Sequence, residues 1–128
     1  MQRILNFLNK HSILIAIVLA GAGLRFYNLT KISLWHDEAF SALLIKYNWG
    51  EMIYRIGLDV HPPMYYFFLR VWHYVFGYSL FSLRSLSIAF GLATIIAVYV
   101  LVKRFFGTTG AALIAASLVA FNPFQIQY

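Results

Sequence analysis

The sequence has no cysteine and few charged residues. Only 11% of its 128 residues are charged, against about 25% in an average soluble domain, and 62% are hydrophobic. A chain of this length has too little interior to bury so much apolar surface in a soluble core, so the surplus is predicted to face lipid. The lack of cysteine excludes disulfides and thiolate chemistry, and it leaves the redox compartment open.

A concentrated basic patch is also missing, although the formal net charge is +6. The ten lysines and arginines are scattered along the chain, which argues against nucleic acid as a partner. In a membrane protein such residues set the orientation and contact lipid phosphates. No internal repeat, low-complexity tract or Gly/Ser linker divides the chain, so residues 1–128 are predicted to form a single membrane domain.

Three stretches are apolar enough to cross a membrane, for which a helix needs about 20 residues. They run from about His11 to Leu29, from Ser85 to Val102 and from about Ala111 to Gln127. Arg25 lies near the far end of the first stretch, where its long side chain is expected to snorkel to the interface. In the third stretch, Pro123 marks a kink or an end. A cleaved signal peptide is the alternative interpretation of the first stretch, but the continuing apolar run favours a retained helix.

The basic residues predict the orientation of these helices. Arg3 and Lys10 place the amino terminus in the cytoplasm, and Lys103 and Arg104 belong on the same side. Both assignments hold when the first span crosses from the cytoplasm to the outside and the second span crosses back. Residues of about 30–84 then form one extracytoplasmic loop.

The segment from Pro62 to Ser79 is long and apolar enough to be a fourth span. However, Arg70 and His73 lie in its middle, and it is rich in Tyr and Trp, which prefer the headgroup boundary. It is therefore predicted to be a helix in the interface, with a fourth span as the alternative. The predicted fold is an all-α, multi-span membrane protein with three or four transmembrane helices and an outer loop of juxtamembrane helices.

All the acidic residues lie in this outer loop, so any catalysis must be built there: Asp37, Glu38, Glu51 and Asp59. The first candidate site is the Asp37–Glu38 pair, which precedes apolar residues at helical spacing (Phe40, Leu43, Leu44 and Tyr47). Asp37 is predicted to cap this helix, as Asp often does. A carboxylate that is held in place and kept ionised can also act as a general base.

Two further candidate sites are basic or polar. His61 precedes Pro62–Pro63, which favours an extended His61 aimed off the start of a helix. It is either an ordinary surface histidine or a contact for phosphate or a divalent metal ion, although no metal-ligand spacing surrounds it. Arg70 and Arg84 either anchor the loop to anionic lipid, the favoured role for Arg70, or bind the phosphate of a lipid-linked donor.

Four motifs in this order resemble the protein mannosyltransferase superfamily, and its bacterial family 39-like branch with the GT-C fold in particular. They are LWHDEA at 34–39, HPPMYYFFLRVWHYVFGYSLFSLRSLS at 61–87, VKRFFG at 102–107 and LVAFNPFQIQY at 118–128. The resemblance implies an inverting transferase of the cell membrane that takes a sugar from a polyprenyl monophosphate on the outer face. The acceptor, whether glycan, lipid or protein, is not implied.

The resemblance also implies roles for individual residues. Asp37 matches the family's proposed catalytic base, with Glu38 beside it. His61 matches a position near the donor phosphate or, in some relatives, a metal ion, and Arg84 matches a recurring arginine. Members of the family are far longer, so the 128-residue chain is predicted to be an amino-terminal fragment that is inactive alone. The alternative function is a non-catalytic small membrane protein or assembly subunit.

Overall fold

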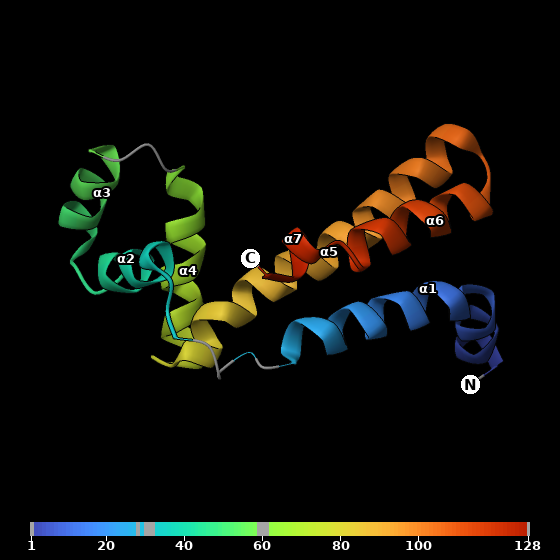
Figure 1. Cartoon of the computed structure of the whole chain (residues 1–128), viewed down its shortest axis with the longest axis horizontal. Coiled ribbons are helices and arrows are strands. Elements are labelled where there is room, and N and C mark those ends of the chain that lie inside the picture. The colour runs from blue at the N-terminus through green and yellow to red at the C-terminus, as the bar shows by residue number, and fades with distance from the viewer. Residues whose placement is uncertain (1, 28, 30–32, 59–61, 128) are drawn as a thin grey trace. The chain divides into compact units, whose positions relative to one another are not determined.

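The computed structural model describes residues 2–27, 29, 33–58 and 62–127, with side chains given for residues 11–126 of these ranges. Every regular element in the described ranges is an α-helix, which confirms the all-α prediction. The chain divides into two compact units, which are described separately (Figure 1). Unit 1 comprises Met1–Asn28 and Ser87–Tyr128, and unit 2 comprises Leu29–Leu86. Unit 2 thus nearly coincides with the predicted outer loop.

Unit 2 contains three short helices and the start of a long one. These are α2 (His36–Leu44), α3 (Trp49–Gly57), α4 (Pro63–Phe76) and the first residues of α5 (Leu80–Phe106). Its interior has two apolar clusters, and Tyr65 packs against both. One cluster is Leu44, Met52, Ile56 and Tyr66; the other is Ile45, Leu69, Leu83 and Leu86.

Local sequence explains where these helices begin and end. Asn48 caps α3, its side-chain oxygen accepting from the Glu51 N–H at 2.9 Å. Pro63 opens α4, where the missing proline N–H is harmless because the first turn has no partner for it. Gly77 ends α4 with a φ of 78°, a left-handed conformation that glycine adopts without strain.

Helix α4 has 14 residues, fewer than the about 20 needed to cross a bilayer. Arg70 and His73 are buried on its inner face, within unit 2. Its other face exposes large apolar side chains, among them Met64, Phe68 and Val71. This length and two-faced character favour the interfacial interpretation over the fourth span.

Unit 1 is formed by α1 (Gln2–Phe26), the rest of α5, α6 (Thr109–Ala120) and α7 (Pro123–Gln127). Three alanines of α6 are fully buried against Ile95 and Tyr99 of α5. They are spaced by four residues and form one small-residue face of α6: Ala112, Ala116 and Ala120. Helix α1 approaches this face closely, since a Cβ at Gly21 would lie 3.4 Å from the Ala120 Cβ. Pro123 begins α7 after α6 has ended, so its predicted role as an end point is confirmed.

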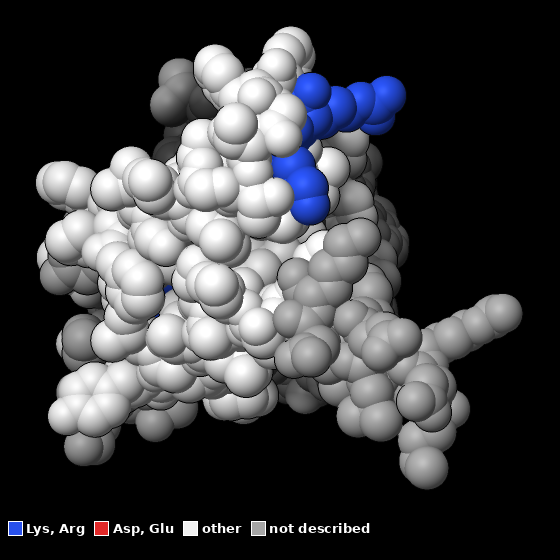
Figure 2. Space-filling view, turned by 90° about the vertical axis from the view of Figure 1, so that its right-hand side faces the viewer, with Lys and Arg blue, Asp and Glu red and all other residues white. Residues whose placement is uncertain are grey.

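One described helix, α5, is long and apolar enough to cross a membrane. The other two predicted spans correspond to apolar helices that are shorter in the described ranges, His11–Phe26 and Thr109–Ala120. The last turn of α5 carries Lys103 and Arg104. Figure 2 shows basic side chains gathered at the upper right of one face, and no acidic side chain is visible among the described atoms of that face.

The prediction that Arg25 snorkels to the interface is wrong. Its side chain is only 4% exposed, and its guanidinium donates to the carbonyl oxygens of Gly21 at 3.1 Å, Ala120 at 3.0 Å and Val119 at 3.4 Å. The last carbonyls of α6 have no partner within their helix and lie at the negative end of its dipole, so they attract a cation. Gly91 leaves room for this contact, because a Cβ there would be 3.1 Å from Arg25 Nε.

Candidate active site

The predicted acidic pair lies in the first turn of α2, but Asp37 is not its cap. The N-cap residue is Trp35, so the capping prediction is wrong. The reason is that α2 begins at His36, so Asp37 already lies inside its first turn. Glu38 reaches back and accepts from the Trp35 N–H at 3.2 Å, which satisfies a donor at the helix start. The two neighbouring carboxylates therefore have different roles.

Asp37 is exposed, and its carboxylate has no hydrogen-bond or salt-bridge partner in the described part of the chain. Its backbone carbonyl accepts from the Ser41 hydroxyl at 2.8 Å, which belongs to the helix. The N-terminal turn of a helix favours negative charge. Asp37 thus presents an exposed carboxylate at the start of α2, and no described residue occupies its oxygens.

Glu38 is held by Arg84, 46 residues further along the chain. Arg84 Nε donates to Oε1 at 2.9 Å and Nη2 donates to Oε2 at 2.7 Å, a paired contact that fits the planar guanidinium to the carboxylate. The side chains are 12% exposed for Arg84 and 32% for Glu38. Both carboxylate oxygens of Glu38 are occupied, so Glu38 positions the first turn of α2.

The same arginine also holds the chain that leads into α2. Arg84 Nη2 donates to the Ser33 carbonyl at 3.2 Å, and Nη1 donates to the Leu29 carbonyl. Arg84 therefore connects the start of α5 with the segment before Asp37. To contact a phosphate as predicted, its guanidinium would have to share or release one of these bonds.

The hydrogen bond from Arg84 lowers the pKa of Glu38; burial opposes this, and the Trp35 N–H adds to it. A carboxyl whose pKa is lower in the folded than in the unfolded state stabilises the fold above its unfolded pKa, about 4.3 for glutamate. We expect unit 2 to lose about 0.5–1 kcal/mol of stability as the pH falls below that value. Tryptophan fluorescence measures this, because all three tryptophans lie in unit 2. In Glu38→Gln this step should vanish, and an unchanged step would contradict the assignment.

Arg70 lies elsewhere in unit 2, on the buried face of α4, and is 8% exposed. It donates to the Tyr47 carbonyl and approaches Met52 Sδ at 3.7 Å, and its guanidinium lies 4.3 Å from the centre of the Trp49 ring. Its Nε is buried without a hydrogen-bond partner in the described part of the chain. Such an unsatisfied group costs about 1–3 kcal/mol, more when charged.

A pocket of about 300 Å³ lies beside Arg70 and His73 in unit 2. Its remaining lining residues are Ile45, Lys46, Tyr74 and Tyr78. Sequence analysis did not single out Lys46 or Tyr78 as functional residues. The sequence does contain a signal for the pocket itself. Arg70 and His73 are three residues apart on an otherwise apolar helix, and this spacing puts them on one face.

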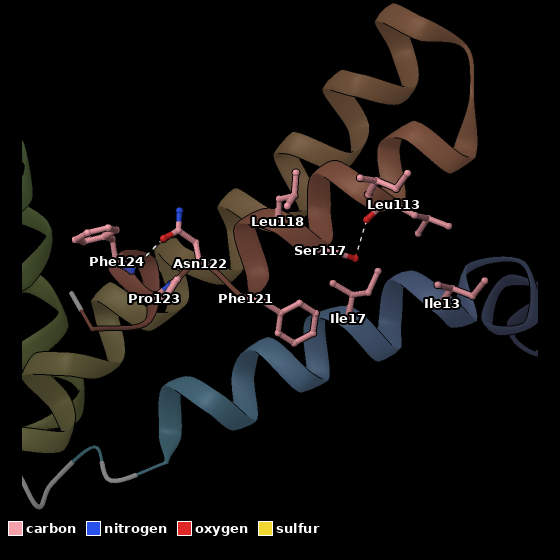
Figure 3. A pocket seen from close by; sticks show the side chains of 10 residues that line it. Ile13, Ile17, Leu113, Ser117, Leu118, Phe121, Asn122, Pro123 and Phe124 are labelled. Atoms are coloured by element: carbon pink, nitrogen blue, oxygen red, sulfur yellow. Dashed lines mark hydrogen bonds between the residues drawn. The ribbon is translucent and has the colours of Figure 1, made fainter.

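A larger groove of about 750 Å³ lies in unit 1, lined by side chains of α1, α6 and α7 (Figure 3). Most of its lining is apolar. Its polar residues are engaged locally: the Ser117 hydroxyl donates to the Leu113 carbonyl, and the Asn122 side-chain oxygen accepts from the Phe124 N–H. No ionisable side chain is among the lining residues of this groove.

His61 and Asp59 lie outside the described residues. The predicted phosphate or metal contact at His61 therefore stays a prediction. Elsewhere in the described ranges, no three His, Asp or Glu side chains gather to form a metal site.

Comparison with models of known protein families identifies the family to which the chain is related. The family described as dolichyl-phosphate-mannose-protein mannosyltransferase matches residues 60–128, more than half of the chain. The chain belongs to this family. Comparisons with curated proteins and with solved structures gave no match. Membership in the mannosyltransferase family confirms the resemblance seen in the motifs and indicates a glycosyltransferase of the mannosyltransferase type.

The family match covers α4, α5, α6 and α7, together with Arg70 and Arg84. Asp37 and Glu38 precede the matched residues. Mannosyltransferases of this family are membrane-associated, in agreement with the length and apolar character of α5. The family match therefore gives no information on Asp37 and Glu38, and the argument for their roles comes from their geometry in unit 2.

Proposed function

We propose that the protein transfers a sugar from a polyprenyl-phosphate donor to an acceptor hydroxyl, with inversion at the anomeric carbon and with Asp37 as the general base. The observation that carries the proposal is the difference between the two acids of α2. Asp37 is exposed and has no partner in the described ranges, whereas Glu38 is engaged through both oxygens. A base must have a free oxygen within reach of the proton that it removes.

The reaction is a single displacement. Asp37 takes the proton of the acceptor hydroxyl as the hydroxyl oxygen forms a bond to the anomeric carbon. The bond from that carbon to the phosphate oxygen breaks on the opposite face, and the phosphate leaves with the electron pair. The transition state has oxocarbenium character, as in glycoside hydrolysis. A phosphate needs no general acid to leave, and cationic groups stabilise its growing charge.

Glu38 and the basic residues support this step in different ways. Glu38 is a positioning residue, because it acts on Asp37 through the Arg84 contact and the start of α2. His61, Arg70 and Arg84 are proposed to contact the donor phosphate. Of the two arginines, Arg70 retains a buried donor without a partner and lines a pocket.

The proposed setting is the cell membrane, with the amino terminus in the cytoplasm. Helix α5 supplies one crossing by its length and composition. The apolar helices His11–Phe26 and Thr109–Ala120 are proposed to complete three crossings. Unit 2 then lies on the extracytoplasmic side, with the exposed apolar face of α4 in the membrane interface.

The configuration of the product tests the reaction class. Membranes from cells that express the protein from its own gene are given a polyprenyl-phosphate sugar of known anomeric configuration, and NMR of the product determines the configuration of the new bond. The expected product has the opposite configuration. Retention would contradict a single displacement, and transfer from a nucleotide sugar but from no lipid-linked sugar would contradict the donor class.

A further inference from the structure

Arg25 is a buried cation in a unit that contains no acidic residue. All four Asp and Glu residues of the chain lie between positions 37 and 59, which belong to unit 2. Within unit 1 the Arg25 side chain is 4% exposed and has no carboxylate to neutralise it. A buried charge without an ion partner is costly, so the hydrogen bonds of the guanidinium must compensate for its burial.

These hydrogen bonds go to backbone carbonyls, and two of the three belong to the end of α6. Arg25 Nη1 donates to the Ala120 carbonyl at 3.0 Å, and Nη2 donates to the Val119 carbonyl at 3.4 Å. The third carbonyl, that of Gly21 at 3.1 Å, lies one turn earlier in α1. Because the last four carbonyls of a helix have no partner within it, Arg25 acts as a cap that α1 supplies to α6.

Two glycines leave the space that the guanidinium occupies. A Cβ at Gly21 would lie 3.2 Å from Arg25 Nη1, and a Cβ at Gly91 of α5 would lie 3.1 Å from Nε. By contrast, a Cβ at Gly23, which is also on α1, would meet nothing within 4 Å. The guanidinium therefore lies in a fitted site formed by α1, α5 and α6.

The position of Gly91 along α5 gives the depth of this site. Gly91 and Lys103 are 12 positions apart on one continuous helix, which corresponds to about 18 Å at 1.5 Å per residue. In the proposed setting Lys103 lies at the cytoplasmic surface, and the hydrocarbon core is about 30 Å thick. The contacts of Arg25 then lie within the core of the membrane.

Helix α6 ends at the same depth. Its 12 residues extend about 18 Å, and Phe121 and Asn122 interrupt the helical path before α7 begins (Figure 3). Carbonyls at a helix end find no water donors in hydrocarbon, so such an end needs donors from the protein. Arg25 supplies them to Val119 and Ala120.

We propose that Arg25 is the residue that allows α6 to end within the membrane, so that the third crossing depends on a side chain of the first. The end of α6 is stable in lipid only when α1 brings the guanidinium to it. Arg25 therefore controls whether the chain after α6 reaches the extracytoplasmic side. The inference rests on the three crossings of the proposed function, and it is independent of the transfer reaction.

Cysteine labelling at position 125 measures whether the third crossing forms. Gln125 is exposed in α7, and the chain has no cysteine of its own. In the otherwise unaltered protein, Gln125→Cys should react with a membrane-impermeant maleimide on intact cells. Arg25→Met keeps an unbranched apolar side chain but loses the donors, so external labelling should fall by about fivefold or more. Unchanged external labelling would overturn the proposal.

Two comparisons separate loss of the cap from a general failure to fold. In the Arg25→Met protein, Asp37→Cys should still be labelled from outside, because α1 crosses without the cap. Gly91→Val crowds the guanidinium and should lower labelling at position 125, whereas Gly23→Val adds the same bulk in open space and should not. Equal losses in the two glycine variants, or loss of labelling at positions 37 and 125 together, would overturn the proposal.

A second measurement does not depend on the sides of the membrane. Hydrogen exchange of the full chain in detergent micelles reports on the last turn of α6, whose amides should exchange about tenfold faster in Arg25→Met. Arg104→Met is the matched control, because it removes an exposed arginine of unit 1 at the far end of α5. Equal exchange in the two variants would overturn the cap.

The two measurements together separate the cap from its setting. Faster exchange in Arg25→Met alone, in a protein whose position 125 is never labelled from outside, would contradict the three crossings and leave only the cap. External labelling that depends on Arg25 in a protein that transfers no sugar would support the inference and contradict the proposed reaction.

Discussion

Asp37→Asn is expected to lower kcat for sugar transfer by about 10²–10⁴-fold, the usual contribution of a positioned general base. Asparagine has nearly the same shape but cannot take a proton at neutral pH. The donor KM should change little, because the base acts on the acceptor hydroxyl in the transition state. The measurement is the initial rate of transfer in membranes that contain equal amounts of variant and unaltered protein.

Glu51→Gln is the control for this prediction. Glu51 is an exposed acid in unit 2 that pairs with Arg55 at 2.9 Å, so its replacement removes one negative charge without touching α2. Its transfer rate should stay within a factor of two of the unaltered rate. Full activity of Asp37→Asn would remove Asp37 from the mechanism, and an equal loss in both variants would indicate a general effect of charge.

Arg84→Met is expected to destabilise unit 2 by about 2–4 kcal/mol, more than a surface pair and approaching the cost of breaking a buried one. The loss is large because Glu38 keeps its charge without a partner, and the carbonyls of Leu29 and Ser33 lose their donor. Tryptophan fluorescence during denaturant unfolding measures it, since Trp35, Trp49 and Trp72 all report on unit 2.

The double variant Glu38→Gln/Arg84→Met distinguishes the ion pair from simple loss of packing. Removing the unpaired charge should recover part of the lost stability, so the two substitutions should be clearly non-additive. Arg55→Met, which breaks an exposed pair within one helix, should shift the unfolding midpoint much less than Arg84→Met. Additive losses in the double variant would show that Glu38 and Arg84 do not interact as described.

Local patterns in the sequence predicted much of the fold. The all-α class follows from long apolar stretches with few charges, and the Pro62–Pro63 pair gives the start of α4. Gly77 gives its end, because a left-handed residue is needed there. These features depend on residues that are close in the sequence, and so they could be predicted without knowledge of the packing.

Contacts between distant residues could not be predicted in this way. Arg25 was expected at the interface, but the end of α6, about 95 residues away, offers it free carbonyls. The cap of α2 is a local error of a different kind: Asp37 was expected there, but the helix begins one residue earlier, at His36. The position of Arg25 thus depends on tertiary packing, whereas the cap depends on where the helix starts.

The candidate site shows the same division. Sequence placed Asp37 and Glu38 together, but their different roles depend on Arg84, which comes from the start of another helix. The pocket beside Arg70 and His73 is completed by Lys46, which comes from the chain after α2. A lysine following a short amphipathic helix carries no functional signal by itself, so this residue could be found only in the folded unit.

The proposed transfer reaction requires Asp37 to lie on the extracytoplasmic side of the membrane, and cysteine labelling measures this. The chain has no cysteine, so a single cysteine at position 37 or, as the reference, at Thr108 can be labelled with a membrane-impermeant maleimide on intact cells. We expect labelling of Asp37→Cys from outside, and labelling of Thr108→Cys only after the cells are permeabilised. Labelling of position 37 only after permeabilisation, or on neither side, would contradict an extracytoplasmic base and with it the proposed transfer reaction.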